Sequence, residues 1–512
     1  MPPTTAARRA PASARIAKLG PVPQTIEDAL ASKEARHWEK AIDREMESLS
    51  AKQVWTPITA SPGVKPLGSR WLFQRSPTAQ GIEYRARVVA KGGGLPSNNS
   101  VDTKALSGPS TDTLFFLLAY AHDHQLYVTH IRIEDPCLSV DLEQPVTIAI
   151  PPRQKFPGKN AFLLTKALYG LKTAPAAGRQ AITRGLEGAG LQPITHDPNL
   201  FVDHNAGLVI EGYNTAIAMM YDGGVVVAGP KGYGQDVLDA LHQSGLQAVR
   251  GPQDLIFGLT VRRDSPDPDC SDRFTISQPQ YVDRVVQRFN NVIEYPVPPS
   301  PFPTPQLTTV LKAFAGCMTW LTSTSHMRYG HYAGELARNA QRQLSPDEWL
   351  DTWEDAYNLL NWLKKDDVRN CQLHVQHTAI DGAPKLFAAT APDGDVFRVN
   401  IFLQGASIQW YSRGSQSALD DDEMLWCGIE AAVKSLIHWR SILREIEPVD
   451  DTLVVVCNTG RMPSRSKALK DAVATIRLMK EEGIELRDFP SEDDNGHVWC
   501  PCCCSQGVGD GE

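Results

Sequence analysis

The residues between positions 295 and 305 place the strongest constraint on the fold of this 512-residue chain. They read YPVPPSPFPTP, with proline at nearly every second position. Proline fixes φ at about −65° and has no N–H to donate, so this stretch must be extended and cannot pair within a sheet. We interpret it as a linker or connection between the parts of the chain that fold on either side of it.

The length of the chain allows two to four domains, each with its own core. A hydrophobic content of 42% and a charged content of 21% are those of an ordinary globular protein, and the net charge is −8. A nucleic-acid binder with this charge would have to concentrate Lys and Arg locally. No apolar run approaches the roughly 18–20 residues of a membrane span, so we expect no membrane partner. The N-terminus has no apolar signal segment, and six of the cysteines stand singly, which suits reduced thiols, so we expect an intracellular location, cytoplasmic or nuclear.

Hydrophobic periodicity predicts a mixed helix and strand content on both sides of the proline stretch. Residues 1–24 are rich in Pro, Ala and Arg and predict a disordered basic arm. Ten cysteines are scattered except for Cys500 and Cys502–Cys504, where adjacent residues cannot all reach one tetrahedral metal centre. We therefore expect a frayed tail there, and no metal site.

Residues 218–230 read AMMYDGGVVVAGP, two apolar runs around a YDGG break. This pattern predicts a β-hairpin, with Gly223 and Gly224 as the turn, because Gly-Gly tolerates the positive φ that a two-residue loop demands.

Five further motifs lie in a recognisable order along the chain. They are WEKAIDREMESL (38–49), RARVVAKG (85–92), KALYGLKTAP (166–175), IFGLTV (256–261) and IQWYSRGSQ (408–416). The ordered set resembles copia-type LTR-retrotransposon reverse transcriptases, in which the polymerase is followed by an RNase H domain. The resemblance covers about residues 25–500.

The resemblance implies an α+β fold: a right-hand polymerase with fingers, palm and thumb, followed by an α/β RNase H-like domain. In this family both active sites use divalent metals, which in the active members are Mg²⁺ ions held by carboxylates. The expected boundaries are a basic arm at 1–24, fingers and palm at 25–294, a proline-rich connection with a helical thumb at 295–375, an RNase H-like domain at 376–500 and a tail at 501–512.

The three carboxylates of the family's polymerase site fall on altered positions. The strand HIRIEDPCLSVDL places Arg132 where the first metal-binding aspartate is expected, with Glu134 and Asp135 nearby but out of register. Aligning Tyr221 with the family tyrosine places Gly223 and Gly224 at the paired aspartates. A rival register places Asp222 at the first of the two. In both registers at most one carboxylate survives, with Asp222 as the remnant.

Other family positions are partly retained. Basic residues of the fingers motif, Arg85, Arg87 and Lys91, could still contact phosphate, or they could form a solvated strand end. In the RNase H domain the four carboxylate positions align with Ala391, Glu423, Asn458 and His497, so only Glu423 is kept. Glu423 follows Asp420–Asp422 at the start of a helix, where acids also cap free N–H groups.

We therefore expect a degenerate reverse transcriptase–RNase H that lacks both activities and binds no metal cofactor. The alternative is a co-opted protein that still binds nucleic acid or a polymerase, with RNA, DNA or an RNA:DNA hybrid as a weakly held partner. A second alternative is an active polymerase with relocated ligands.

Overall fold

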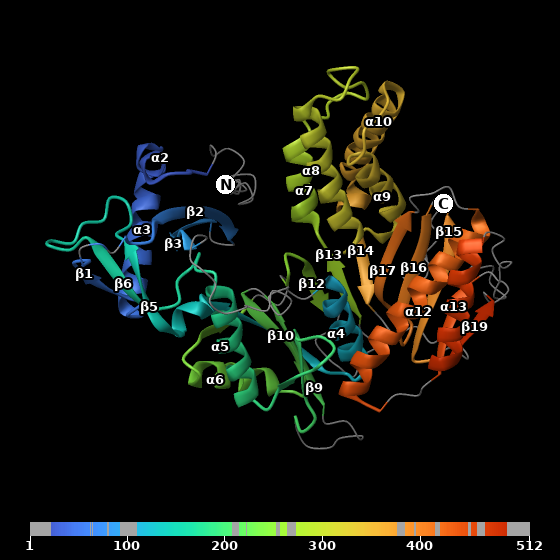
Figure 1. Cartoon of the computed structure of the whole chain (residues 1–512), viewed down its shortest axis with the longest axis horizontal. Coiled ribbons are helices and arrows are strands. Elements are labelled where there is room, and N and C mark those ends of the chain that lie inside the picture. The colour runs from blue at the N-terminus through green and yellow to red at the C-terminus, as the bar shows by residue number, and fades with distance from the viewer. Residues whose placement is uncertain are drawn as a thin grey trace, which may run out of the picture. The chain divides into compact units, whose positions relative to one another are not determined.

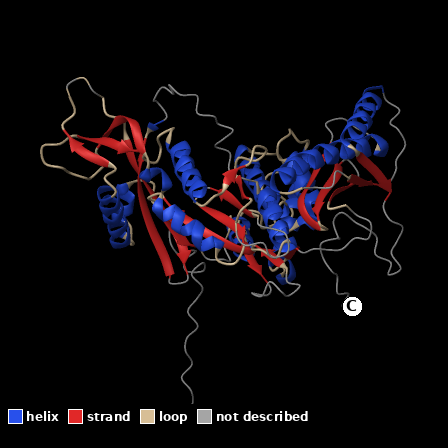
Figure 2. Cartoon of the chain, turned by 90° about the horizontal axis from the view of Figure 1, so that it is seen from below, coloured by secondary structure: helices blue, strands red, loops and turns tan. Residues whose placement is uncertain are grey.

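A computed structural model describes residues 22–61, 63, 65–78, 81–92, 110–206, 215–221, 223–251, 256–263, 273–375, 384–393, 396–414, 420–448, 452–457 and 466–488. The chain divides into two compact units, and both contain helices and strands. Figure 2 shows the helices and strands of the described residues. Unit 1 comprises Met1–Ser107, Ile133–Ala189 and Val237–Val249, and unit 2 comprises Gly108–Arg132, Gly190–Asp236 and Arg250–Glu512. Nearly all of the predicted arm and the whole cysteine tail lie outside the described residues, and the predicted domain boundaries stay predictions.

Unit 1 is built around a helix whose apolar residues recur every three or four positions. This helix, α3 (Ala35–Ala51), buries Trp38, and the Trp38 ring lies 5.3 Å from Phe73 and 4.8 Å from Tyr84. Phe73 and Tyr84 belong to two antiparallel strands that pair with each other, β2 (Ser69–Thr78) and β3 (Gly81–Ala90). The elements of unit 1 are α2 (Ile26–Ala31), α3, β1 (Trp55–Ile58), β2 (Ser69–Thr78), β3 (Gly81–Ala90), η2 (Pro136–Ser139), β5 (Asp141–Ala149), β6 (Ala161–Lys166), α5 (Ala174–Gly188) and most of β11 (Gln247–Arg250).

Unit 2 begins with a helix that is buried along most of its length, α4 (Thr111–Asp123), followed by the strand β4 (Tyr127–Glu134). This strand pairs with β10, and the sheet continues in the order β4-β10-β9-β8-β7. The predicted hairpin is confirmed as β9 and β10, whose side chains are almost all buried. The other elements are β7 (Gln192–Pro193), β8 (Leu200–Asp203), β9 (Ala216–Tyr221), β10 (Gly224–Gly229) and part of α6 (Tyr233–Gln243).

A helical bundle is inserted between two paired strands of unit 2. The strand β13 precedes the bundle, β14 follows it, and the two pair antiparallel beside β12. Buried Trp349 and Trp353 of α10 lie in the bundle core. The elements are β12 (Thr260–Arg263), β13 (Phe274–Ser277), α7 (Pro279–Phe289), α8 (Pro305–Thr322), η3 (Met327–Tyr329), α9 (Gly330–Asn339), α10 (Pro346–Leu363), α11 (Asp366–Arg369) and β14 (Gln372–Val375), with the helices grouped as Figure 1 shows.

The C-terminal part of unit 2 is a five-stranded sheet in the order β17-β16-β15-β18-β19, with α12 and α13 packed on it (Figure 1). Strands β15 to β17 are antiparallel, whereas β15, β18 and β19 run parallel. The α4 helix shares this core, because Phe115 stacks on Trp410 at 4.9 Å and Phe116 on Trp439 at 5.1 Å. The elements are β15 (Leu386–Asp393), β16 (Val396–Leu403), β17 (Ala406–Gly414), α12 (Asp421–Ile446), β18 (Leu453–Cys457), α13 (Ser466–Glu482) and β19 (Ile484–Asp488).

None of the helices in the described part of the chain is long and apolar enough to cross a membrane.

Candidate functional site

The tip of the β9–β10 hairpin differs by one residue from the predicted turn. Tyr221 pairs with Gly224, so residues 222 and 223 separate the two strands and Gly224 is the first residue of β10. The prediction that Gly223 and Gly224 together form the turn is therefore wrong. Gly223 has φ of +93°, a conformation that suits glycine. Asp222 lies outside the described residues.

In the register that aligns Tyr221 with the family tyrosine, the structure brings together two of the positions that the resemblance assigns to metal-binding carboxylates. In the antiparallel pairing of β4 with β10, Arg132 lies directly opposite Gly224. Gly224 is also opposite Tyr221 on its other side, so all three residues belong to one row across the sheet. Arg132 and Glu134 are exposed and alternate with buried Ile131 and Ile133, as the strand prediction required.

The space beside Gly224 is filled by neighbouring atoms. A Cβ placed on Gly224 would lie 2.8 Å from the Tyr221 hydroxyl oxygen and 3.0 Å from Tyr221 Cζ, and closer still to the carbonyl oxygen of Ile131. The Tyr221 hydroxyl is hydrogen-bonded to His130 Nε2, and the Phe257 ring lies 5.0 Å from the Tyr221 ring. Position 224 therefore accepts glycine and leaves no room for a carboxylate side chain.

His130 is a member of this site that the sequence did not reveal. It is buried, it pairs with Val226 in the sheet, and its carbonyl oxygen accepts the N–H of Gly251 at 2.9 Å. Because successive side chains of a strand point to opposite faces, its position two residues before Arg132 indicates that His130 and Arg132 lie on the same face of β4. Tyr221 is 91 residues further along the chain, so no local pattern connects the two.

Asp135, one of the acids near the expected metal position, forms an ion pair within unit 1. Its Oδ1 accepts from Arg87 Nη2 at 3.0 Å, and the Arg87 guanidinium lies 5.1 Å from the centre of the Tyr169 ring. Glu45 lies in the same environment, where its Oε1 accepts the N–H of Val88 at 3.1 Å. Burial, with a smaller contribution from the Asp135 charge, raises the pKa of Glu45 to about 7.

The three basic residues of the fingers motif share one face of the β3 strand and its end. Arg85 and Arg87 alternate with buried Tyr84, Ala86 and Val88. Arg85 Nε lies 3.0 Å from Glu83 Oε1, and the arginine side chains are 37% and 36% exposed. Lys91, just past the strand, is exposed. Both arginines are thus half-solvated and paired with acids of their own unit.

The predicted RNase H positions are only partly described. Ala391 lies in β15 opposite Arg398 of β16. Glu423 is 1% exposed, and its backbone N–H donates to Asp420 Oδ1 at 2.8 Å while its own Oε2 accepts the Asp420 N–H at 3.2 Å. This reciprocal pair is a capping box at the start of α12. Asn458 and His497 lie outside the described residues. In the part of the chain that the structure describes, no three His, Cys, Asp or Glu side chains gather as a metal site would require.

Comparisons of the sequence with known proteins show which class of protein the chain resembles. Residues 52–300 match the family of reverse transcriptases, RNA-dependent DNA polymerases. The chain is 25% identical over 275 residues to the Retrovirus-related Pol polyprotein from transposon TNT 1-94 of Nicotiana tabacum, covering 52% of this chain and 20% of the relative. It is also 25% identical over 280 residues to the Pol polyprotein from transposon RE1 of Arabidopsis thaliana, covering 53% of this chain and 18% of the relative.

A solved structure agrees on the fold. The foamy viral protease-reverse transcriptase dRH, solved "in complex with ds DNA", superposes with a TM-score of 0.52 at 11% identity, covering 90% of this chain and 70% of that one. The predicted fold class, a polymerase of mixed helices and strands, is confirmed. Residues 52–300 belong to the reverse transcriptase family. Within that class the matched relatives are retrotransposon Pol polyproteins, and the chain spans about a fifth of their length.

Proposed function

We propose that this protein is a derived reverse transcriptase–RNase H that has lost both the polymerase and the nuclease reaction. The observation that carries the proposal is the row Tyr221–Gly224–Arg132 across the sheet. In the register that aligns Tyr221 with the family tyrosine, two of the positions assigned to metal-binding carboxylates by resemblance are occupied there by a glycine and an arginine; in the rival register Gly223 takes the place of Gly224, and Arg132 still replaces the first aspartate.

The chemistry explains why this row matters. A two-metal polymerase holds two Mg²⁺ ions about 4 Å apart, and Mg²⁺ takes oxygen ligands. A guanidinium has only N–H donors and a positive charge, so Arg132 cannot bind Mg²⁺ and repels it. Glycine supplies no ligand, and the Tyr221 ring beside Gly224 leaves no space for a metal-bound carboxylate on that residue. One remaining acid at position 222 would be too few ligands for two ions.

The C-terminal sheet with its helices α12 and α13 fits the α/β RNase H-like domain that the resemblance implies. Of its four expected carboxylates, position 391 is alanine in β15, and Glu423 is engaged in the capping box of α12. Glu423 is 1% exposed, and its carboxylate accepts the backbone N–H of Asp420. The side chain is therefore fixed at the first turn of α12. These features support loss of the nuclease reaction as well.

Primer extension on an RNA template and cleavage of an RNA:DNA hybrid, each with Mg²⁺ and with Mn²⁺, test the proposal. We expect no product above a no-protein control, with an active reverse transcriptase as the positive control. Template-dependent synthesis, or hybrid cleavage that is abolished by Glu423→Gln, would contradict it.

Residual nucleic-acid binding is a second candidate function, favoured by one feature of unit 1. The face of the β2–β3 hairpin that carries Arg85 and Arg87 also carries exposed Arg70 and Leu72 of β2, because Leu72 pairs with Arg87 and Arg70 with Val89. A basic, partly apolar strand face can contact both phosphate and base. Together with this candidate function we propose an intracellular location, cytoplasmic or nuclear.

A salt titration of hybrid binding distinguishes this candidate from a solvated strand end. Changing Arg85, Arg87 and Lys91 to Ala should weaken binding and reduce the salt slope by about one for each phosphate that the protein no longer neutralises. The matched control replaces Lys364, Lys434 and Lys480, three exposed lysines of unit 2, and should leave the slope unchanged. Equal slopes for the two triple variants would exclude binding through the hairpin.

A further inference from the structure

A cavity lies between the helical bundle and the C-terminal sheet of unit 2, and its volume is about 210 Å³. It is lined by the end of α8, by η3 and α9, and by the strands β16 and β17, and Figure 1 shows α9 beside β17. A cavity of about 150 Å³ already holds a benzene ring. This one therefore has room for a ligand with about two fused rings.

Small residues of α9 form one wall of the cavity. The lining residues of this helix include Gly330, Ala333, Gly334 and Ala337. Because residues three, four and seven positions apart lie on the same side of a helix, these four share one face of α9. A Cβ placed on Gly330 would meet no atom of the described residues within 4 Å. The space therefore exists because this face of α9 carries no large side chain.

Another wall contains a tryptophan that is fixed in place by contacts within the protein. Trp410 of β17 lines the cavity, its indole N–H donates to the carbonyl oxygen of Thr322 at 2.8 Å, and its ring stacks on Phe115 at 4.9 Å. The hydroxyls of Thr319 and Ser323, which also line the cavity, donate to carbonyl oxygens of α8. Since these groups already have hydrogen-bond partners, a ligand would meet them mainly as an apolar and aromatic surface.

The charged side chains that line the cavity are basic. Arg398 and Asn400 of β16 line it, and Asn400 pairs with Trp410, so these three side chains lie on one face of the sheet. No Asp or Glu is among the described residues that line the cavity. His331, the other basic lining residue, lies 3.5 Å from Glu335 of its own helix. We therefore assign the recognition of an anion to Arg398, whose planar guanidinium matches the geometry of a carboxylate.

We propose that this cavity binds a small planar aromatic carboxylate. The ring of the ligand occupies the space between the small residues of α9 and Trp410, where it contacts the indole, and its carboxylate pairs with Arg398. Both walls are held by contacts within the protein, so binding requires little reorganisation. The proposal is independent of whether the polymerase and nuclease reactions are lost.

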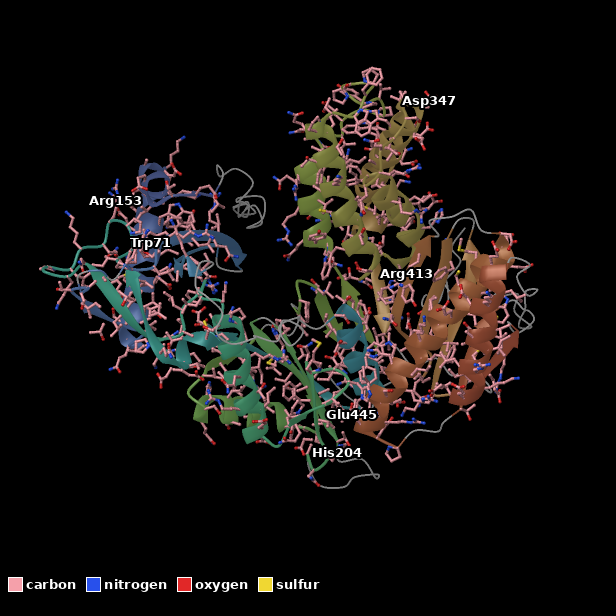
Figure 3. The ribbon with its side chains drawn as sticks, viewed as in Figure 1. Trp71, Arg153, His204, Asp347, Arg413 and Glu445 are labelled. Carbon is pink, nitrogen blue, oxygen red and sulfur yellow. The ribbon has the colours of Figure 1, made fainter. Side chains whose placement is uncertain are left out.

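Isothermal titration calorimetry of the full-length chain with 2-naphthoate tests the proposal, and 2-naphthamide is the neutral probe of nearly the same shape. We expect naphthoate to bind with a single site per chain, and the amide to bind at least about tenfold more weakly because it cannot form a charge-assisted pair with Arg398. Arg398→Met should lower the affinity for naphthoate to that of the amide. The control, Arg413→Met, should bind like the wild type, because Arg413 (Figure 3) is an exposed arginine of β17 outside the cavity lining.

Filling the cavity gives a second readout. Gly330→Leu should abolish naphthoate binding without lowering the urea midpoint, because its side chain enters open space and leucine favours a helix more than glycine does. Gly316→Leu, in α8 outside the cavity lining, is the matched control and should leave binding unchanged. The comparison of naphthoate with the amide needs no variant. The proposal is overturned if naphthoate at about 1 mM does not bind, if the amide binds as tightly, or if Arg398→Met or Gly330→Leu retains the wild-type affinity.

Discussion

Replacing Gly224 by alanine adds one methyl group at the centre of the row formed by Tyr221, Gly224 and Arg132. That carbon would lie 2.8 Å from the Tyr221 hydroxyl oxygen and nearer to the Ile131 carbonyl oxygen, so β10 and the Tyr221 ring must both move. Overpacking of this kind destabilises by about 1–3 kcal/mol. Displacing the Tyr221 hydroxyl from His130 removes a hydrogen bond worth about 0.5–1.5 kcal/mol. We therefore expect the free energy of unfolding to fall by roughly 2–4 kcal/mol.

Urea-induced unfolding followed by tryptophan fluorescence measures this decrease. Gly316→Ala is the matched control, because a Cβ at Gly316 in the interior of α8 meets no atom within 4 Å. It should stabilise by about 0.5–1 kcal/mol, the usual gain for Gly→Ala within a helix.

A double-mutant cycle tests whether contact with the Tyr221 hydroxyl oxygen contributes to this destabilisation. In a Tyr221→Phe background, which removes the hydroxyl, Gly224→Ala should be less destabilising by about 0.5–1.5 kcal/mol. If Gly224→Ala instead lies within about 0.5 kcal/mol of the wild type, position 224 has room for a side chain and the steric explanation is wrong.

Two further outcomes are expected from residues outside this row. The pKa of Glu45 is raised to about 7, so the folded state binds a proton more tightly than the unfolded state, and stability falls as the pH rises from about 4.5 to 7. Glu45→Gln should flatten that decline and stabilise the protein at pH 8 by up to about 3 kcal/mol in urea unfolding, and an unchanged pH profile would contradict the assignment. Asp420→Ala removes the acceptor of the Glu423 N–H and should destabilise by about 0.5–2 kcal/mol, whereas no change in the urea midpoint would mean that the capping box does not hold α12.

Features that depend on local pattern could be predicted from the sequence. The spacing of Trp38, Ala41 and Leu49 predicts α3, and the alternation around Arg132 predicts β4, because burial on one face follows directly from helix and strand geometry. The capping interpretation of Asp420 and Glu423 was also accessible, since residues three apart meet at a helix start.

Features that depend on contacts between distant residues could not be predicted. The one-residue error in the hairpin turn arose because DGG offers two possible turns, and only the pairing of Tyr221 with Gly224 decides between them. The Arg87–Asp135 ion pair joins residues 48 positions apart. Because of this pair Arg87 is a half-solvated partner of an acid, whereas the sequence suggested a side chain available to bind phosphate. The hydrogen bonds from the Trp353 and Trp349 indoles of α10 to the carbonyl oxygens of Tyr295 and Ser300 likewise join residues 58 and 49 positions apart.

Counting bound Mn²⁺ is the sharpest test of the proposal that this chain lacks a two-metal polymerase site. Electron paramagnetic resonance can follow a Mn²⁺ titration of the full chain in the presence of template–primer and an incoming nucleotide. We predict that the protein adds no Mn²⁺ sites beyond those of the nucleic acid and nucleotide alone. Two additional ions for each chain would show that the catalytic metal site is intact, in contradiction to the proposed function.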